Sequence, residues 1–319
     1  MKQRIDSLDI AKALCIILVV IGHFNPDNAP VFWKWVNTII YSFHMPLFLF
    51  ASGLVYHYTL NKKQSFTSFI GKKLKRLAVP YLITSAIIIT IKLASQGNAQ
   101  VDNPVSLYSF IEMFYLPSAG YFLWFVWVLM LMFVIIWFAK SKTSRTILFL
   151  ISIALYYIPV NFPEIFCLRQ SKVMMIYFMA GVMFGEYNLA TILKHSLANI
   201  AYLLLYAIAF FFFNNSGDSL VPIVAFAGIL AILCISKWLD SLSSLKSKVL
   251  LPLAAASYTI YLFHTTFMGF AKAVVAKLHI NSLFILEATI VILCGIVVPL
   301  TLHQALKRHR MGRIMIGVK

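Results

Sequence analysis

The chain has 319 residues, of which 61% are apolar and only 12% are charged, and its mean hydropathy is +0.87. Soluble globular proteins are about half apolar and about one quarter charged, so this composition excludes an ordinary soluble protein and indicates a polytopic membrane protein. The formal net charge of +17 does not indicate a nucleic-acid-binding protein, because Lys and Arg lie mostly in short loops between apolar segments, where they set membrane orientation.

Ten apolar segments each approach the roughly 20 residues that a helix needs to cross the hydrocarbon core of a bilayer. They span residues 6–24, 36–57, 77–94, 119–139, 146–162, 172–187, 198–213, 220–237, 251–271 and 282–304. We therefore predict an all-α fold, a polytopic transmembrane helical bundle of about ten spans, in a single domain over residues 1–319. Lys and Arg gather in alternate connections, which predicts that both termini are cytoplasmic. These connections include Lys2, Arg4, Lys72, Lys73, Lys75, Arg76, Lys307, Arg308, Arg310 and Arg313.

The first span contains three ionisable residues, Asp9, Lys12 and His23. In a helix, the 11 residues from Lys12 to His23 bring both side chains within about 20° of one direction, and Asp9 lies about 40° from His23. Ionisable groups inside a membrane span are costly and indicate a functional site. An unperturbed imidazole titrates near neutral pH, so His23, near the outer end, could accept a proton from a hydroxyl group. The alternative is a His at the headgroup boundary and a Lys whose amine reaches the cytoplasm.

The second span and the loop after it add further candidate groups. His44 falls in the outer half of the span, and Pro46 frees a backbone carbonyl group beside it. The loop ends with the basic residues Lys72, Lys73 and Arg76. Lys73 and Arg76 are neighbours on a helix and could grip a phosphate-rich ligand. An ordinary positive-inside anchor with affinity for anionic lipid is the alternative, and composition alone favours it.

The connection of residues 95–118 is the longest on the predicted outer side, and it contains no Lys or Arg. Its aromatic residues Tyr108, Phe110, Phe114 and Tyr115 indicate a segment that lies in the membrane interface. Such a segment could form a lid or a platform for substrate.

The last two spans contain His264 and Glu287. His264 lies in the middle or outer half of the ninth span, at a depth similar to that of His23 and His44. A lone His in an apolar span is usually a hydrogen-bonded structural residue, but three at one depth favour a polar cavity. Glu287, just inside the outer end of the tenth span, is a candidate partner that orients a His or raises its basicity. Its alternative role is a carboxylate that reaches interfacial water.

Signatures of other enzyme classes are absent from the sequence. No Walker loop, dinucleotide-binding glycine pattern, HExxH motif or nucleophile elbow occurs at a credible position. The four cysteines, Cys15, Cys167, Cys234 and Cys294, lie far apart and form no CxxC pair. We therefore predict that the protein binds no metal.

Several stretches together resemble the acyltransferase-3 family of integral-membrane O-acyltransferases, especially its fucose 4-O-acetylase-like branch. They follow one another in family order over most of the chain, and the basic residue followed by ten residues and His is the most specific. The stretches are Arg4 to Lys12 with Gly22-His23, Tyr41 to Gly53, Lys73 to Tyr81, Leu123-Trp124-Phe125 and Tyr258 to His264.

The resemblance implies an enzyme of the bacterial inner membrane that moves acetyl from cytoplasmic acetyl-CoA to a sugar hydroxyl of a surface glycan or its lipid-linked precursor. It implies that His23 is the catalytic His, that Lys12 fills the family's basic position, and that Lys73 with Arg76 binds CoA. We add Lys72 and Trp124 to the predicted CoA-binding residues, and His44, His264, Asp9 and Glu287 to the predicted catalytic group. The chain departs from the family in two places: Lys12 replaces the commoner Arg, which loses its planar fork, and Ala13 replaces Gly.

The hypothesis requires the acyl group to travel from a cytoplasmic donor to His23 near the outer face. We expect the pantetheine arm to pass through a pore beside Lys12, with His23 as general base or, alternatively, as an acylated relay. Two other interpretations stay open: a transporter or flippase of a lipid-linked saccharide, which would use the same histidines for proton coupling, and a transferase for another acyl-CoA. The oligomeric state is also open, a homo-oligomer included.

Overall fold

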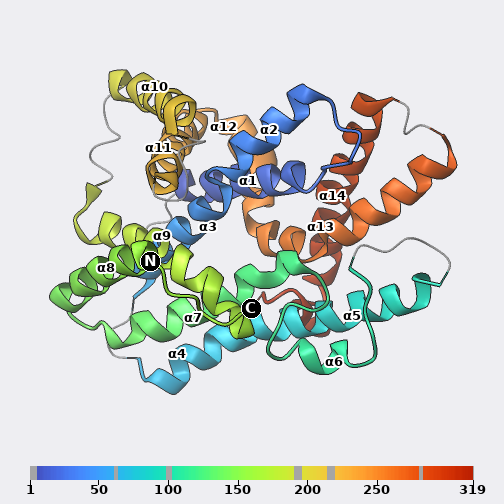
Figure 1. The fold of residues 1–319 in the computed structure, drawn as a ribbon, viewed down its shortest axis with the longest axis horizontal. Helices are drawn as coiled ribbons and strands as arrows, with labels where there is room; N and C mark the ends of the chain where they lie inside the picture. Colours follow the sequence, from blue (N-terminus) through green and yellow to red (C-terminus); the bar gives the residue numbers. More distant parts are fainter. Residues whose placement is uncertain are drawn as a thin grey trace. The chain divides into compact units, whose positions relative to one another are not determined.

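The computed structural model of the chain describes residues 6–60, 64–97, 103–189, 196–213, 220–279 and 283–318. Within these ranges the regular secondary structure is helical and includes no β-strand, which confirms the predicted all-α fold (Figure 1). In the described part of the chain, seven helical segments are long and apolar enough to cross a membrane. The chain is thus a polytopic membrane protein by length and composition of its helices, while the count of ten spans and the cytoplasmic termini stay predictions. Lys2 and Arg4 lie outside the described residues.

Each of the ten predicted segments overlaps at least one helix. The helices are α1 (Asp6–Gly22), α2 (Val31–Tyr41), α3 (His44–Thr59), α4 (Phe66–Lys73), η1 (Leu74–Ala78), α5 (Val79–Ser95), α6 (Ser109–Glu112), η2 (Tyr121–Leu123), α7 (Trp124–Phe138), α8 (Lys142–Tyr157), η3 (Ile165–Cys167), α9 (Leu168–Glu186), α10 (Ser196–Phe213), α11 (Val221–Asp240), α12 (Ser243–Leu245), η5 (Lys246–Leu250), α13 (Leu251–Lys277), α14 (Phe284–Leu306) and α15 (Arg310–Met315). Several extend beyond the predicted limits, because hydropathy marks the apolar centre of a helix and not its polar ends.

Two helices, α2 and α3, make up the second predicted span, 36–57, and together they form one apolar stretch, Val31–Thr59, that is long enough to cross a membrane. The chain leaves α2 through Ser42 and Phe43 and starts α3 at His44. Pro46 has no N–H group and cannot donate to the carbonyl group of Ser42, which removes one bond of a continuous helix. Proline is tolerated in a first turn, where N–H groups lack helical partners, so α3 begins beside it.

The chain divides into two compact units. The first unit combines residues 1–58 with residues 180–301, and the second combines residues 59–179 with residues 302–319. In the first unit, α1 packs against α11 and α13, and Ile10, Ala13, Ile16 and Val19 of α1 are fully buried. The close packing of α1 fixes the direction of the polar residues that it carries.

The second unit is built around α4, α5 and α7. Phe69 of α4 stacks on Trp137, near the end of α7, and the Tyr81 hydroxyl of α5 accepts a hydrogen bond from Trp127 Nε1, at 3.0 Å. These pairs show that the α4–α5 segment and α7 run in opposite directions. The short helix α15 packs against α5 in the same unit.

A π-helical turn lies before each of two helices that start with proline. In η1 the N–H group of Val79 donates to the carbonyl group of Leu74, and in η5 that of Leu251 donates to Lys246, five residues earlier in each case. Pro80 and Pro252 supply no N–H group for the normal bond to the fourth preceding residue, so the ladder shifts by one residue. Because Pro80 has no N–H group, the carbonyl group of Arg76 lacks its usual helical donor. This carbonyl group lies against Gly317, where an added Cβ atom would be 2.2 Å from its oxygen.

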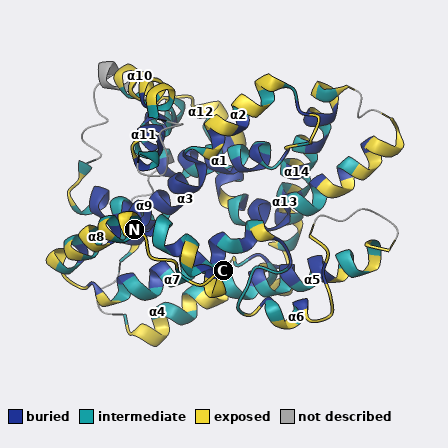
Figure 2. Cartoon of the chain, viewed as in Figure 1, coloured by how far each residue is buried: buried dark blue, intermediate teal, exposed yellow. Residues whose placement is uncertain are grey.

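Many large apolar side chains remain exposed, as expected of helices that face lipid. The exposed faces of α8 and α10 are yellow in Figure 2, while α1 and α3 are largely dark blue. The exposed apolar residues on these two helices include Ile147, Leu150, Ile151, Leu203, Leu204, Ile208 and Phe211. The candidate residues Asp9, Lys12 and His44 therefore lie on helices that are largely buried.

Candidate functional site

Asp9 and Lys12 form an ion pair on α1. The Nζ atom of Lys12 lies 3.1 Å from Oδ1 of Asp9, and the two side chains are 26% and 20% exposed. The charges are three residues apart, as neighbours on one helix face must be. Partial burial strengthens their attraction, and pairing lowers the cost of holding a partly buried ammonium group.

The structure brings His23 and His264 into direct contact. Their ring centroids are 4.8 Å apart and the rings meet edge to face at 84°. His44 lies within electrostatic range of His23, and the ring of Tyr41 packs against His44 at 4.9 Å. His23, directly after α1, His44 of α3 and His264 of α13 therefore lie in one region of the first unit.

Each of these histidines has its Nδ1 atom turned toward the backbone carbonyl oxygen of a residue three or four positions earlier in the chain. The distances are 2.8 Å from His23 to Val19, 2.9 Å from His44 to Ile40, and 2.8 Å from His264 to Tyr261. A carbonyl oxygen can only accept, so the neutral imidazole must carry its proton on Nδ1. The lone pair is then on Nε2, which is the nitrogen able to act as a base.

Glu287 lies in the first turn of α14 and is buried. Three residues before it, Phe284 packs against Phe24, the residue that follows His23, with ring centroids 5.8 Å apart. These contacts put the first turn of α14 near the C-terminal end of α1. An acidic residue also stabilises a helix N-terminus through the helix dipole, so the position has a structural reason as well.

The sequence analysis missed Lys272 as a neighbour of His23. Its Nζ atom lies 5.7 Å above the ring of Phe24, and its charge acts on His23. We assigned Lys272 to an outer connection because the predicted ninth span ended at residue 271, whereas α13 continues to Lys277. A cation beside His23 can stabilise negative charge that develops on a reacting oxygen.

In the second unit, Lys73 packs against aromatic rings. Its ammonium nitrogen lies 3.7 Å from the ring centroid of Phe133 on α7 and 5.4 Å from that of Phe69 on α4. Phe69 in turn stacks on Trp137 at 5.1 Å. A cation over an aromatic face is attracted by the ring quadrupole, so these contacts hold Lys73 in place.

The other residues predicted for the CoA side are placed differently. Lys72 and Arg76 are exposed, and Arg76 acts electrostatically on Lys73. Trp124 starts α7, nine residues before Phe133, which corresponds to about 14 Å along the helix axis. The structure therefore groups the three basic residues and leaves Trp124 apart from them.

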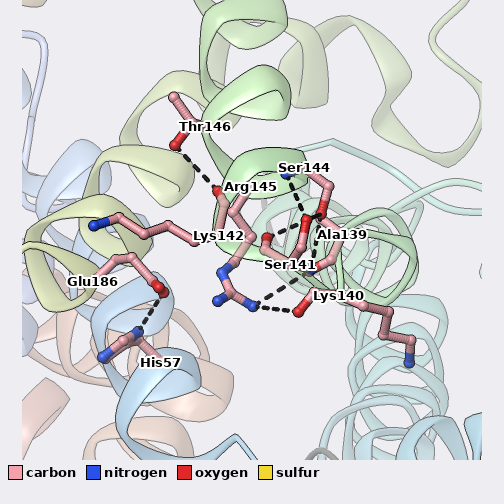
Figure 3. A network of polar contacts seen from close by, with 9 residues as sticks. All are labelled: His57, Ala139, Lys140, Ser141, Lys142, Ser144, Arg145, Thr146 and Glu186. Carbon is pink, nitrogen blue, oxygen red and sulfur yellow. Dashed lines mark hydrogen bonds and ion pairs between the residues drawn. The ribbon is translucent and has the colours of Figure 1, made fainter.

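Figure 3 shows polar contacts that the sequence analysis did not identify. In the first unit, His57 Nδ1 lies 3.3 Å from Glu186 Oε2. In the second unit, the buried guanidinium group of Arg145 donates to the carbonyl oxygens of Ala139, at 3.4 Å, and Lys140, at 3.1 Å. These carbonyl groups lie just after α7, so Arg145 stabilises the end of that helix.

The described part of the predicted outer connection presents one apolar face. Its exposed residues are Leu107, Tyr108, Ile111 and Phe114. The opposite side is anchored, because the Tyr81 hydroxyl donates to the carbonyl groups of Met113, at 2.9 Å, and Leu116, at 3.1 Å. The geometry suits a segment that lies in the membrane interface, and a lid or platform role stays a prediction.

Over the residues that the structure describes, no group of three or more His, Cys, Asp or Glu side chains could hold a metal ion. The histidine cluster of the first unit contains His23, His44 and His264 and is surrounded mainly by helix backbone and aromatic rings.

Comparison with known proteins matches residues 5–304 to the acyltransferase domain of the acyltransferase-3 family. The Nodulation protein NolL of Sinorhizobium fredii is 38% identical over 101 residues, covering 29% of this chain and 26% of that protein. The Nodulation protein NolL of Mesorhizobium japonicum is 37% identical over 93 residues, covering 28% of this chain and 25% of that protein. The chain thus spans about a quarter of the length of these curated relatives. No solved structure matches the chain significantly.

Proposed function

The chain belongs to the acyltransferase-3 family, and we propose that it transfers acetyl from cytoplasmic acetyl-CoA to a saccharide hydroxyl group. The proposed acceptor is a cell-surface glycan or its lipid-linked precursor, and the proposed location is the bacterial inner membrane. One observation carries the proposal: the 2.8 Å contact from His23 Nδ1 to the Val19 carbonyl oxygen, which makes Nε2 the basic nitrogen.

In the proposed reaction, His23 acts as a general base. Its Nε2 atom removes the proton from the acceptor hydroxyl while the hydroxyl oxygen attacks the thioester carbonyl carbon. A carbon–oxygen bond forms and the carbon–sulfur bond breaks, so the CoA thiolate leaves and takes the proton from the His23 imidazolium. Lys272, the cation beside the His23 region, is the proposed group that stabilises negative charge on the thioester oxygen.

We propose separate roles for the other predicted residues. Lys72 and Arg76, which are exposed, bind the phosphate groups of CoA, and Lys73 keeps that basic surface ordered through its aromatic contacts. Asp9 neutralises Lys12, His44 and Glu287 complete the polar surroundings of the base, and Trp124 is left out because it lies apart from the basic residues.

A transfer assay tests the proposal. Purified full-length protein in lipid nanodiscs is mixed with radiolabelled acetyl-CoA and candidate saccharides, and label in the saccharide is measured. We expect His23→Ala to lower kcat by about 10²- to 10⁴-fold, the range of general-base contributions. His309→Ala is the matched control, because His309 is exposed and its side chain makes no helix-capping bond. Full transfer by folded His23→Ala protein would reject the assignment.

A further inference from the structure

A cavity of 710 Å³ lies within the first unit, beside the outer end of α1. It is formed by the segment after His23, one face of α2, and the start of α11. Its lining consists of Asn25, Pro26, Asp27, Lys34, Asn37, Thr38, Tyr41, Ser42, Val221 and Val224. Sites for small ligands have volumes of about 300–1,000 Å³, so the cavity is of suitable size.

Tyr41 connects this cavity to the histidine cluster. Its hydroxyl donates to the carbonyl group of Gly22 at 3.2 Å, and its ring packs against that of His44 at 4.9 Å. A Cβ atom on Gly22 would lie 3.3 Å from the Tyr41 ring, so glycine permits this approach. Asn25, two residues after His23, lines the cavity as well. The cavity therefore adjoins the segment of chain that carries the proposed base.

Asn37 is a buried polar residue of the cavity wall, and its side-chain oxygen is an unused acceptor that the protein encloses. It is 7% exposed, and its Nδ2 group donates to Oδ1 of Asn25 at 3.1 Å. Its own Oδ1 atom accepts no hydrogen bond from any residue that the structure describes. Leaving a buried acceptor without a donor costs about 1–3 kcal/mol, so a turn of the Asn37 side chain that brings Oδ1 to the cavity surface is favoured when a ligand supplies a hydroxyl group.

The charges of the lining indicate which ligand fits. Asp27 and Lys34 contribute one negative and one positive charge, and the remaining polar groups are amides and hydroxyls. A ligand with several phosphates would need more cations than this, whereas a neutral sugar needs amides, hydroxyls and an aromatic face such as Tyr41. The lining thus differs from the basic residues proposed for CoA.

We infer that this cavity binds the acceptor saccharide and that Asn37 Oδ1 accepts a hydrogen bond from one of its hydroxyl groups. The inference rests on the proposed function, which supplies the reason for a saccharide next to His23. The face of α2 beside the cavity carries the exposed apolar residues Val31, Phe32, Trp35 and Ile39, which suits a helix in the membrane interface. Both a free saccharide and one attached to a lipid can reach a cavity at that level.

Binding and transfer are measured together on full-length protein in nanodiscs. The probes are methyl glycosides of neutral sugars in one arm and the same sugars joined to a polyprenyl phosphate in the other. Asn37→Leu removes the acceptor oxygen at similar volume, and Thr38→Trp fills the cavity from an exposed position. Asn161→Leu is the control, because it is the same replacement of asparagine by leucine at an exposed residue outside the cavity.

We expect Asn37→Leu to raise the acceptor Kd and KM about tenfold or more, with the KM for acetyl-CoA unchanged, and Thr38→Trp to abolish acceptor binding. Tighter binding in one arm identifies the free or the lipid-linked saccharide as acceptor. Wild-type affinity in both variants, or no binding of any glycoside by the wild type in either arm, overturns the inference. Glycoside binding that both variants lose, without any acetyl transfer by the wild type, refutes the proposed function but keeps the cavity as a saccharide site.

Discussion

Neutralising Asp9 is expected to destabilise the protein, because it removes the ion-pair partner of Lys12. At 3.1 Å, two unit charges attract by about 5 kcal/mol at an effective dielectric constant near 20. Both side chains keep about a quarter of their exposure, so water screens the pair, and burial of the charges offsets part of the attraction. We expect a net coupling of about 1–2 kcal/mol.

A double-mutant cycle measures this coupling. The variants Asp9→Asn, Lys12→Met and the double variant are unfolded thermally in nanodiscs and followed by circular dichroism. Each single change should lower the free energy of unfolding by about 1–2 kcal/mol, and the double variant should recover most of the loss because no lone charge remains. Additive losses, with a coupling energy near zero, would refute the argument from burial.

The same double variant separates stability from chemistry. Lys12→Met removes the cation of α1. If the double variant is stable but no longer transfers acetyl, we conclude that Lys12 takes part in the reaction. Unchanged transfer in that variant would restrict Lys12 to a structural role. The KM for acetyl-CoA, measured beside kcat, tells whether donor binding or the chemical step is affected.

Three further predictions concern packing. Gly181→Ala should lower the Tm by several degrees because its Cβ atom would lie 2.0 Å from the Phe50 carbonyl oxygen, whereas Gly269→Ala, which meets open space, should leave the Tm unchanged or raise it. Lys73→Met should cost about 0.5–2 kcal/mol of unfolding free energy through the lost cation–π contact, and equal stability in denaturant titration would contradict that contact. Arg145→Ala should cost about 1.5–3 kcal/mol, since its charge-assisted bonds to two carbonyl groups vanish, and a loss below about 0.5 kcal/mol would argue against them.

The helical period of the sequence was sufficient to predict the arrangement of α1. Lys12 lies on the predicted face with Asp9, and a 3.1 Å contact joins the two. His23 and His264 were predicted at similar depth, and their rings lie 4.8 Å apart, while the polar cavity expected of the three histidines stays a prediction. Local periodicity and membrane depth restrict where a side chain lies, and both can be read from one chain.

The remaining features depend on how segments pair. Lys73 is held by Phe133 of α7, sixty residues away, and hydropathy carries no information about that pairing. The break between α2 and α3 was missed although Pro46 was noticed, because a proline inside an apolar run can either kink a helix or start one. Asn37 was missed because a polar residue near the end of a span looks like an ordinary interfacial residue until its burial is known.

The contact between His23 and His264 bears on the fate of the proton in the proposed reaction. Two imidazolium rings with centroids 4.8 Å apart would repel each other, so protonation of one opposes protonation of the other. The base must return its proton to the CoA thiolate before the next turnover, and the fully buried ring of His264, packed edge to face on His23, holds the His23 ring in position for that transfer. His264→Asn should therefore lower kcat and leave the acceptor KM unchanged, provided that the Tm is retained. A higher acceptor KM with an unchanged kcat would mean that His264 serves acceptor binding instead.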